Sequence, residues 1–147
     1  MGLKFDEFQV GASYESARRT VREADVQLFA GLSADYNPLH TDEQYIKENT
    51  GFRQCIVHGA LTFAISTGFS FQDGLTRGTT LGFLGTEIAW KKPVYAGDTI
   101  HMVTTVLDKI ESKKPGRGIV IFGRDIYNQD GELCMASKAT LLVKRDS

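Results

Sequence analysis

The segment HGALTFAISTGFSF, residues 58 to 71, constrains the fold more than any other stretch of the chain. Its large apolar side chains point in every direction around a helical wheel, and a helix that is apolar all round is buried all round. We therefore expect a long helix that other elements enclose, with small residues that let neighbouring backbone come close. The large residues are Leu61, Phe63, Ile65, Phe69 and Phe71, and the small ones are Gly59, Ala60, Ala64, Ser66, Thr67 and Gly68.

Four segments with the two-residue period of strands follow this helix. They are TTLGFLGTEIAW, DTIHMVTTVLDKI, GIVIFGRDIYNQ and ELCMASKATLLVK, all rich in β-branched and aromatic residues. The stretches PVYAGD, KKPGRG and NQDG are typical of the connections in an antiparallel meander. An early strand around SYESARRTV raises the number to five. The sequence thus predicts one α+β domain spanning residues 1–147, with a sheet of about five strands wrapped around the buried helix.

Charge and cysteine usage exclude several classes of protein. The formal net charge is −1, so we expect neither a nucleic acid nor an anionic membrane as the main partner. No run approaches the roughly 20 apolar residues that span a bilayer, and no signal peptide is recognisable. Cys55 and Cys134 lie outside any metal-binding or disulfide pattern, which fits a cytoplasmic protein. We expect no metal and no cofactor.

Two shorter helices are predicted before residue 58. The stretch EADVQLFAGLSAD has apolar residues at helical spacing and is expected to end near Asp35. In TDEQYIKENTG, Thr41 and Gln44 form a capping box, and Gly51 is expected to stop the helix. Between the two helices lies SADYNPLH, residues 33 to 40, which places an acid, an amide, a proline and a histidine in one short loop.

Three motifs together resemble the MaoC-like dehydratases, the (R)-specific enoyl-CoA hydratase branch of the hotdog fold. They are FAGLSADYNPLH, the IVHG that follows about eighteen residues later, and KPVYAGDT. The likeness runs from about residue 20 to the C-terminus. It implies a hotdog domain, a homodimer or a multiple of dimers, and an acyl-CoA thioester substrate. The implied reaction is the reversible addition of water to trans-2-enoyl-CoA, which gives (R)-3-hydroxyacyl-CoA.

The resemblance gives the loop a chemical role. Hydration requires that water lose a proton while the developing enolate is stabilised. Asp35 and His40 are the candidates that act together on one water, with Asn37 and Pro38 shaping the turn. Burial against the apolar helix is expected to make Asp35 a stronger base. Without the resemblance, an acid before Asn-Pro reads more simply as a residue of a helix-terminating turn.

The start of the long helix is the expected oxyanion site, because its first amides are unpaired and lie at the positive end of the helix dipole. In the family pattern the amide of Gly59 binds the thioester oxygen. His58 either shapes the helix entry or only fills space. A hydroxyl is also part of the pattern, and Thr67 occupies its aligned position with Ser66 adjacent, so the choice between the two stays open.

The sequence gives only weak indications of a functional role for the remaining residues. Lys113, Lys114 and Arg117 either contact the phosphates of coenzyme A or form a solvated loop, whereas His101 reads as an ordinary strand residue. A catalytic role for Cys55 is not expected. Gly82, Gly85 and Gly123 are expected to be bends in the sheet.

Two alternative functions remain. A hotdog thioesterase tends to carry an acid inside the long helix, which residues 59 to 71 lack. A non-catalytic acyl-CoA-binding protein has no need for both Asp35 and His40.

Overall fold

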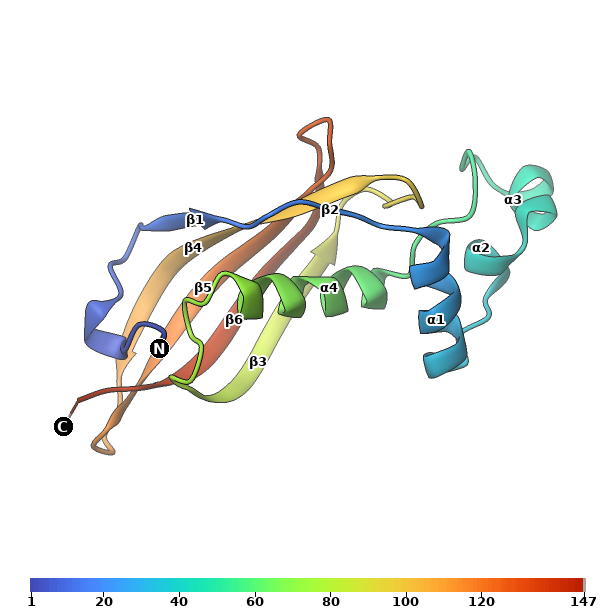
Figure 1. Ribbon diagram of the computed structural model, residues 1–147. Helices are drawn as coiled ribbons and strands as arrows, with labels where there is room; N and C mark the ends of the chain where they lie inside the picture. The colour runs from blue at the N-terminus through green and yellow to red at the C-terminus, as the bar shows by residue number, and fades with distance from the viewer. Residues whose placement is uncertain (147) are drawn as a thin grey trace.

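An antiparallel sheet and one helix laid along it form the centre of the structure, a computed structural model that describes residues 1–146 (Figure 1). The sheet has six strands in the order β1-β4-β5-β6-β3, and β2 pairs with β4 beside β1. The strands are β1 (Ser13–Glu15), β2 (Arg19–Thr20), β3 (Thr80–Trp90), β4 (Thr99–Glu111), β5 (Arg117–Tyr127) and β6 (Leu133–Lys144).

Three of the helices, α1, α2 and α3, gather at one end of this sheet, and the short η1 lies at the other end (Figure 1). Helix α4 lies along the sheet, and α1, α2 and α3 cluster beyond its N-terminal end (Figure 1). No helix within residues 1–146 combines the length and the apolar character needed to cross a membrane. The helical elements are η1 (Phe5–Glu7), α1 (Glu23–Ser33), α2 (Pro38–Thr41), α3 (Glu43–Asn49) and α4 (Gly59–Gln72).

The predicted α+β class is confirmed, and the four long strands lie where the sequence placed them. The early segment differs from the prediction, because it forms two short strands, β1 and β2, that both pair with β4. The meander is correct only for β4, β5 and β6, since β3 pairs with β6 at the far edge of the sheet. The stretch PVYAGD therefore does not join neighbouring strands. It crosses from β3, at one edge of the sheet, to β4 near the other edge.

The helix predicted over TDEQYIKENTG is α3, and its N-cap lies one residue later than predicted. Asp42 is the N-cap of α3, and its carboxylate accepts a hydrogen bond from the amide of Tyr45 at 2.9 Å. Thr41 instead ends α2, where its hydroxyl donates to main-chain carbonyls of the preceding loop. The helix stops at Asn49 with Thr50 as its C-cap, so Gly51 is not needed to stop it.

Helix α4 is buried on one face only, which corrects the expectation that it is enclosed all round. Its sheet-facing side carries the buried Leu61, Ile65 and Phe69. Its opposite side is exposed because a single sheet can cover only one side of a helix. The exposed residues of α4 are Ala60, Ala64, Thr67, Gly68, Phe71 and Gln72.

Candidate active site

The end of helix α1 brings Asp35 to the site. Ala34 has a left-handed backbone conformation, with φ of 60°, which ends the helix and turns the chain. The hydroxyl of Ser33 donates to the carbonyl of Phe29 at 2.7 Å and accepts the amide of Asp35 at 3.2 Å. The Asp35 side chain therefore leaves from a turn that is fixed by local hydrogen bonds.

A short helix, α2, carries His40. Asn37 is its N-cap, with the side-chain oxygen accepting the amide of Leu39 at 3.0 Å, and Pro38 occupies the first helical position. Asp35 adds a further bond, because its carboxylate accepts the amide of Asn37 at 3.2 Å. The turn-shaping roles expected for Asn37 and Pro38 are thus seen in the structure. The sequence analysis missed α2, although Asn followed by Pro is a helix-start signal.

The hydrogen bond of His40 defines which ring nitrogen is free. Its Nδ1 lies 2.7 Å from the carbonyl oxygen of Ile56. A carbonyl can only accept, so Nδ1 carries a proton. In the neutral ring the lone pair is then on Nε2, which is the nitrogen available to take a proton from water.

His58 lies behind His40 and is 1% exposed. The two imidazole rings are stacked, with centroids 3.9 Å apart and planes at 27°, and Phe29 packs edge-on against His58. Nε2 of His58 donates to the main-chain carbonyl of Asp35 at 2.9 Å, whereas Nδ1 is buried without a partner. His58 thus contacts both expected catalytic residues, which favours the reading that it shapes the helix entry over simple space filling.

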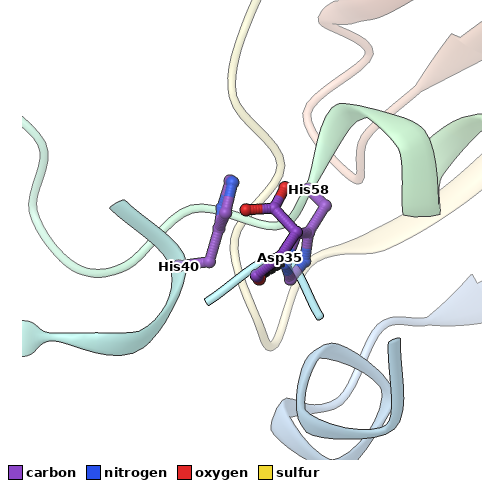
Figure 2. Close-up of side chains that lie close together, drawn as sticks. All are labelled: Asp35, His40 and His58. Carbon is purple, nitrogen blue, oxygen red and sulfur yellow. Dashed lines mark hydrogen bonds between the residues drawn. The ribbon is translucent and has the colours of Figure 1, made fainter. Parts of the chain in front are cut away.

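Asp35, His40 and His58 converge at one point (Figure 2). One nitrogen or oxygen atom from each lies within 4.8 Å of the others. The Asp35 carboxylate is exposed in the single chain, so the burial expected for it is not present there.

The three groups do not suit a metal ion, although their atoms are close. An imidazole binds a metal through a lone pair in the plane of its ring. Two rings stacked face to face direct their lone pairs alongside each other and not toward one ion. The structure instead brings one carboxylate and one imidazole close together, Asp35 and His40, with a second imidazole stacked on the first.

Gly59 begins helix α4 directly beside this cluster. No side chain caps the first turn, so its amides are available to an acceptor. Trp90 covers the other side of Gly59, and its indole N–H donates to the Gly59 carbonyl at 3.1 Å. A Cβ atom at position 59 would lie only 2.7 Å from the indole, which explains the need for glycine. The sequence analysis did not identify this contact, because β3 and α4 are distant in sequence.

A groove of about 480 Å³ opens at Gly59. Asp35 and His40 do not line it, but both contact His58, the N-cap residue of α4. Two lysines are among its lining residues, Lys91 and Lys92, and Lys92 forms an ion pair with Glu132. The groove is lined by Phe52, Ile56, Val57, Gly59, Ala60, Thr62, Trp90, Lys91, Lys92, Pro93 and Val94.

The two candidate hydroxyls of α4 point in different directions. Ser66 is 3% exposed, and its hydroxyl donates to the carbonyl of Phe63 at 2.5 Å. Thr67 is exposed, and its hydroxyl donates to the carbonyl of Ala64 at 2.6 Å. Only Thr67 lies on the open face of the helix.

The structure does not bring the basic loop to this cluster. Lys113 and Lys114 belong to the β4–β5 connection, which Arg117 follows, and this connection lies at the opposite end of the sheet from α2 and α3 (Figure 1). Within one chain these residues therefore cannot bind a ligand together with Asp35 and His40.

The remaining polar candidates behave as ordinary structural residues. His101 lies on β4, where it pairs with Glu15 at 3.3 Å. Burial and a hydrogen bond with Glu43 raise the pKa of the Cys55 thiol to about 11, so it stays protonated at neutral pH.

The glycines of the sheet also have structural explanations. Gly82 and Gly85 adjoin shifts in the β3–β6 register, and a Cβ atom on Gly123 would meet Leu107 at 3.3 Å.

Comparison with known proteins relates the whole arrangement to one family. Residues 7–121 match the family described as MaoC like domain. An (R)-specific enoyl-CoA hydratase from Rhodospirillum rubrum is 34% identical over 141 residues, covering 95% of this chain and 90% of that protein. A MaoC-like dehydratase structure from the same organism superposes with a TM-score of 0.89, at 34% identity and 99% coverage of both chains. A Mycobacterium tuberculosis protein with a double hotdog fold gives a TM-score of 0.86 at 17% identity, with 99% of this chain and 45% of that chain covered, which shows the fold alone.

Proposed function

The chain belongs to the MaoC-like domain family and has its hotdog fold, and from this premise we propose that it catalyses the reversible hydration of trans-2-enoyl-CoA to (R)-3-hydroxyacyl-CoA. The observation that carries the proposal is the convergence of Asp35 and His40 beside the first turn of α4. The hydratase activity named for the Rhodospirillum rubrum relative agrees with it.

Asp35 and His40 act on one water molecule in this proposal. The water oxygen bonds to C3 of the enoyl group while one of its protons passes to Nε2 of His40, whose lone pair is free because Nδ1 donates to Ile56. The carboxylate of Asp35 orients the water and stabilises the imidazolium that forms. His40 then delivers the proton to C2 on the same face, so the atoms of water are added in full and the pair returns to its starting state.

Gly59 stabilises the charge that develops on the substrate. As water attacks C3, the electrons of the double bond move toward the thioester oxygen. The amide at the start of α4 donates to that oxygen, and removal of one comparable donor costs about 3 kcal/mol of transition-state stabilisation. His58 acts as a positioning residue, since it holds the Asp35 carbonyl and stacks on His40 without facing the substrate.

Thioester hydrolysis is the second candidate, and the content of α4 argues against it. Residues 59 to 72 include no acid that could activate water against the thioester carbonyl. A purely acyl-CoA-binding role leaves the paired Asp35 and His40 without a purpose.

We propose that the working form is a homodimer or a multiple of it. Strand β3 has a hydrogen-bonded neighbour on one side only, and the outer face of α4 is exposed beside it. A second copy across this edge would cover both and would bury Asp35 and Thr67 more deeply. The phosphate contacts suggested for Lys113, Lys114 and Arg117 would then have to be made to a ligand of the second chain. The setting we propose is the cytoplasm.

One experiment separates the candidate functions. The protein is incubated with trans-2-enoyl-CoA esters of graded length while loss of the conjugated absorbance and release of free thiol are followed together. Loss of absorbance without thiol release is the expected result. Thiol release would identify a thioesterase, and tight binding with neither signal would identify a non-catalytic protein.

A further inference from the structure

A row of polar side chains crosses the helix-facing side of the sheet. Thr104 lies opposite Arg124 in the register of β4 and β5, and Arg124 lies opposite Ser137 in that of β5 and β6. Their exposed fractions are 2%, 7% and 7%. The row separates two hydrophobic clusters of the core. On each strand the residues two positions before and after the row are buried and apolar. They are Met102 and Val106 on β4, Phe122 and Ile126 on β5, and Met135 and Ala139 on β6.

Within residues 1–146 the guanidinium of Arg124 has the ring of Phe122 as a neighbour, 5.3 Å from the ring centroid, but it has no hydrogen-bond or ion-pair partner. Its Nε is buried without a hydrogen bond, and none of the ion pairs found within residues 1–146 includes it. Burial lowers the pKa of Arg124, and Asp73 opposes that effect from a distance greater than that of an ion pair. A guanidinium remains charged at any physiological pH, and a buried charge is costly unless an opposite charge joins it. Within residues 1–146 no carboxylate lies at ion-pair distance from Arg124, so the site is suited to an anion from outside.

The row lies close to the proposed thioester site. Trp90, whose indole contacts Gly59, lies opposite Met135, and Ile88 lies opposite Ser137. The two pairs are two residues apart along each strand, a distance of about 6.8 Å, and Arg124 lies opposite Ser137 on the next strand, about 4.8 Å further across the sheet. A short acyl group whose thioester oxygen meets the Gly59 amide can therefore extend its far end toward the row.

The geometry points to Arg124 as a specificity-determining residue that binds a carboxylate at the far end of a short enoyl group. A guanidinium and a carboxylate form two parallel hydrogen bonds, which adds direction as well as charge. An alkyl end would leave Arg124 unpaired, so such a substrate is disfavoured. This inference rests on the proposed function and adds a substrate class to it.

The test compares two substrates with equal numbers of carbon atoms. They are trans-2-hexenoyl-CoA and its analogue with a carboxylate in place of the terminal methyl group. We expect the native protein to favour the carboxylate substrate in kcat/KM by about tenfold or more. Arg124→Met should remove or reverse this preference, and Arg124→Lys should keep part of it. Arg18→Met, a matched change at an exposed arginine, should leave the preference intact.

Each other outcome has a defined meaning. Equal kcat/KM for the two substrates in the native protein would overturn the inference, whatever the variants do, and so would equal losses on both substrates in Arg124→Met. If the native protein is an oligomer and Arg124→Met is a monomer, Arg124 binds an acidic residue of a second copy and not the substrate. That result would also overturn the inference. Turnover of the methyl-ended ester by the native protein tests hydration itself, so the proposed function can survive the failure of this inference.

Discussion

Strands β3 and β5 have the same length and belong to the same sheet, yet they differ in how much of them is covered. Every second residue of β5 is buried and the others are half-buried. Nearly every residue of β3 is exposed, including Phe83 at 46% and Trp90 at 53%. The difference arises because β5 has a hydrogen-bonded neighbour on both sides and β3 on one side only.

The comparison teaches that the chain has a closed side and an open side. The closed side holds the two hydrophobic clusters and supplies the stability of the domain. The open side, formed by β3 and the outer face of α4, carries apolar residues that one chain cannot bury. The expected catalytic groups lie beyond the N-terminal end of α4, so the proposed reaction and the proposed dimer contact both involve the open side.

Matched substitutions on the two strands should give the largest difference. Phe122 is fully buried, so Phe122→Ala should lower the free energy of unfolding by about 3–5 kcal/mol. Phe83→Ala should cost about 0.5 kcal/mol in a dilute monomer, because the side chain is already exposed. Denaturant unfolding over a range of protein concentrations measures both. A large cost for Phe83→Ala at the lowest concentration would contradict the division into two sides.

Changes at the site should alter turnover and leave stability nearly unaffected. Asp35→Asn and His40→Ala are each expected to lower kcat roughly 10²-fold or more, and the double variant should be little worse than either, because the two groups act on one water. Binding of a substrate analogue should persist. Steady-state kinetics and thermal unfolding of the same preparations test this, and near-normal hydration by Asp35→Asn would return Asp35 to the role of a turn residue.

An arginine on the outer face of α4 should weaken assembly. Ala64 is small and exposed, so Ala64→Arg leaves the single chain intact but blocks the close approach of a second helix. We expect this variant to sediment as a monomer with reduced activity, whereas Ala17→Arg, at an exposed position outside the open side, should behave as the native protein. A native chain that is fully active as a monomer at micromolar concentration would refute the proposed dimer.

The smallest effect is expected at Cys55. Its pKa of about 11 lies above the ordinary value near 8.5, so the reactive thiolate is scarce at neutral pH. Cys55→Ser should keep native activity, and alkylation of the native thiol should accelerate only as the pH rises toward 11. Mass spectrometry of the alkylated protein follows this rate. Rapid alkylation at pH 7 would contradict the assignment.

The sequence was sufficient for features that depend on local pattern. Alternation predicted the long strands, and the all-round apolar segment predicted α4. The same signals could not show that β3 joins β6, because register across the sheet depends on partners distant in sequence. The open face of α4 was missed for a related reason: an apolar residue that its own chain buries and one that its own chain leaves exposed give the same sequence pattern.

The residues of the candidate site were expected in part from the sequence, and their catalytic roles stay predictions. The chemistry of Asp35, His40 and Gly59 followed from a resemblance, and the structure then placed these residues together. The contacts of His58 and Trp90 were not predictable, since each joins segments that meet only in the folded chain. Arg124 was also missed, because an arginine in a strand usually lies on its solvent face. Its burial, in phase with Phe122 and Ile126 on β5, shows that it lies on the helix-facing side.

The contact between Trp90 and Gly59 gives the protein a built-in optical reporter. The chain contains a single tryptophan, so its ultraviolet-excited emission comes from one place in the fold. That indole is half exposed and donates its N–H to the residue whose amide is proposed to hold the thioester oxygen. A ligand that enters beside Gly59 will change the solvent around the indole, so a fluorescence titration can follow occupancy of this site without labelling and without turnover.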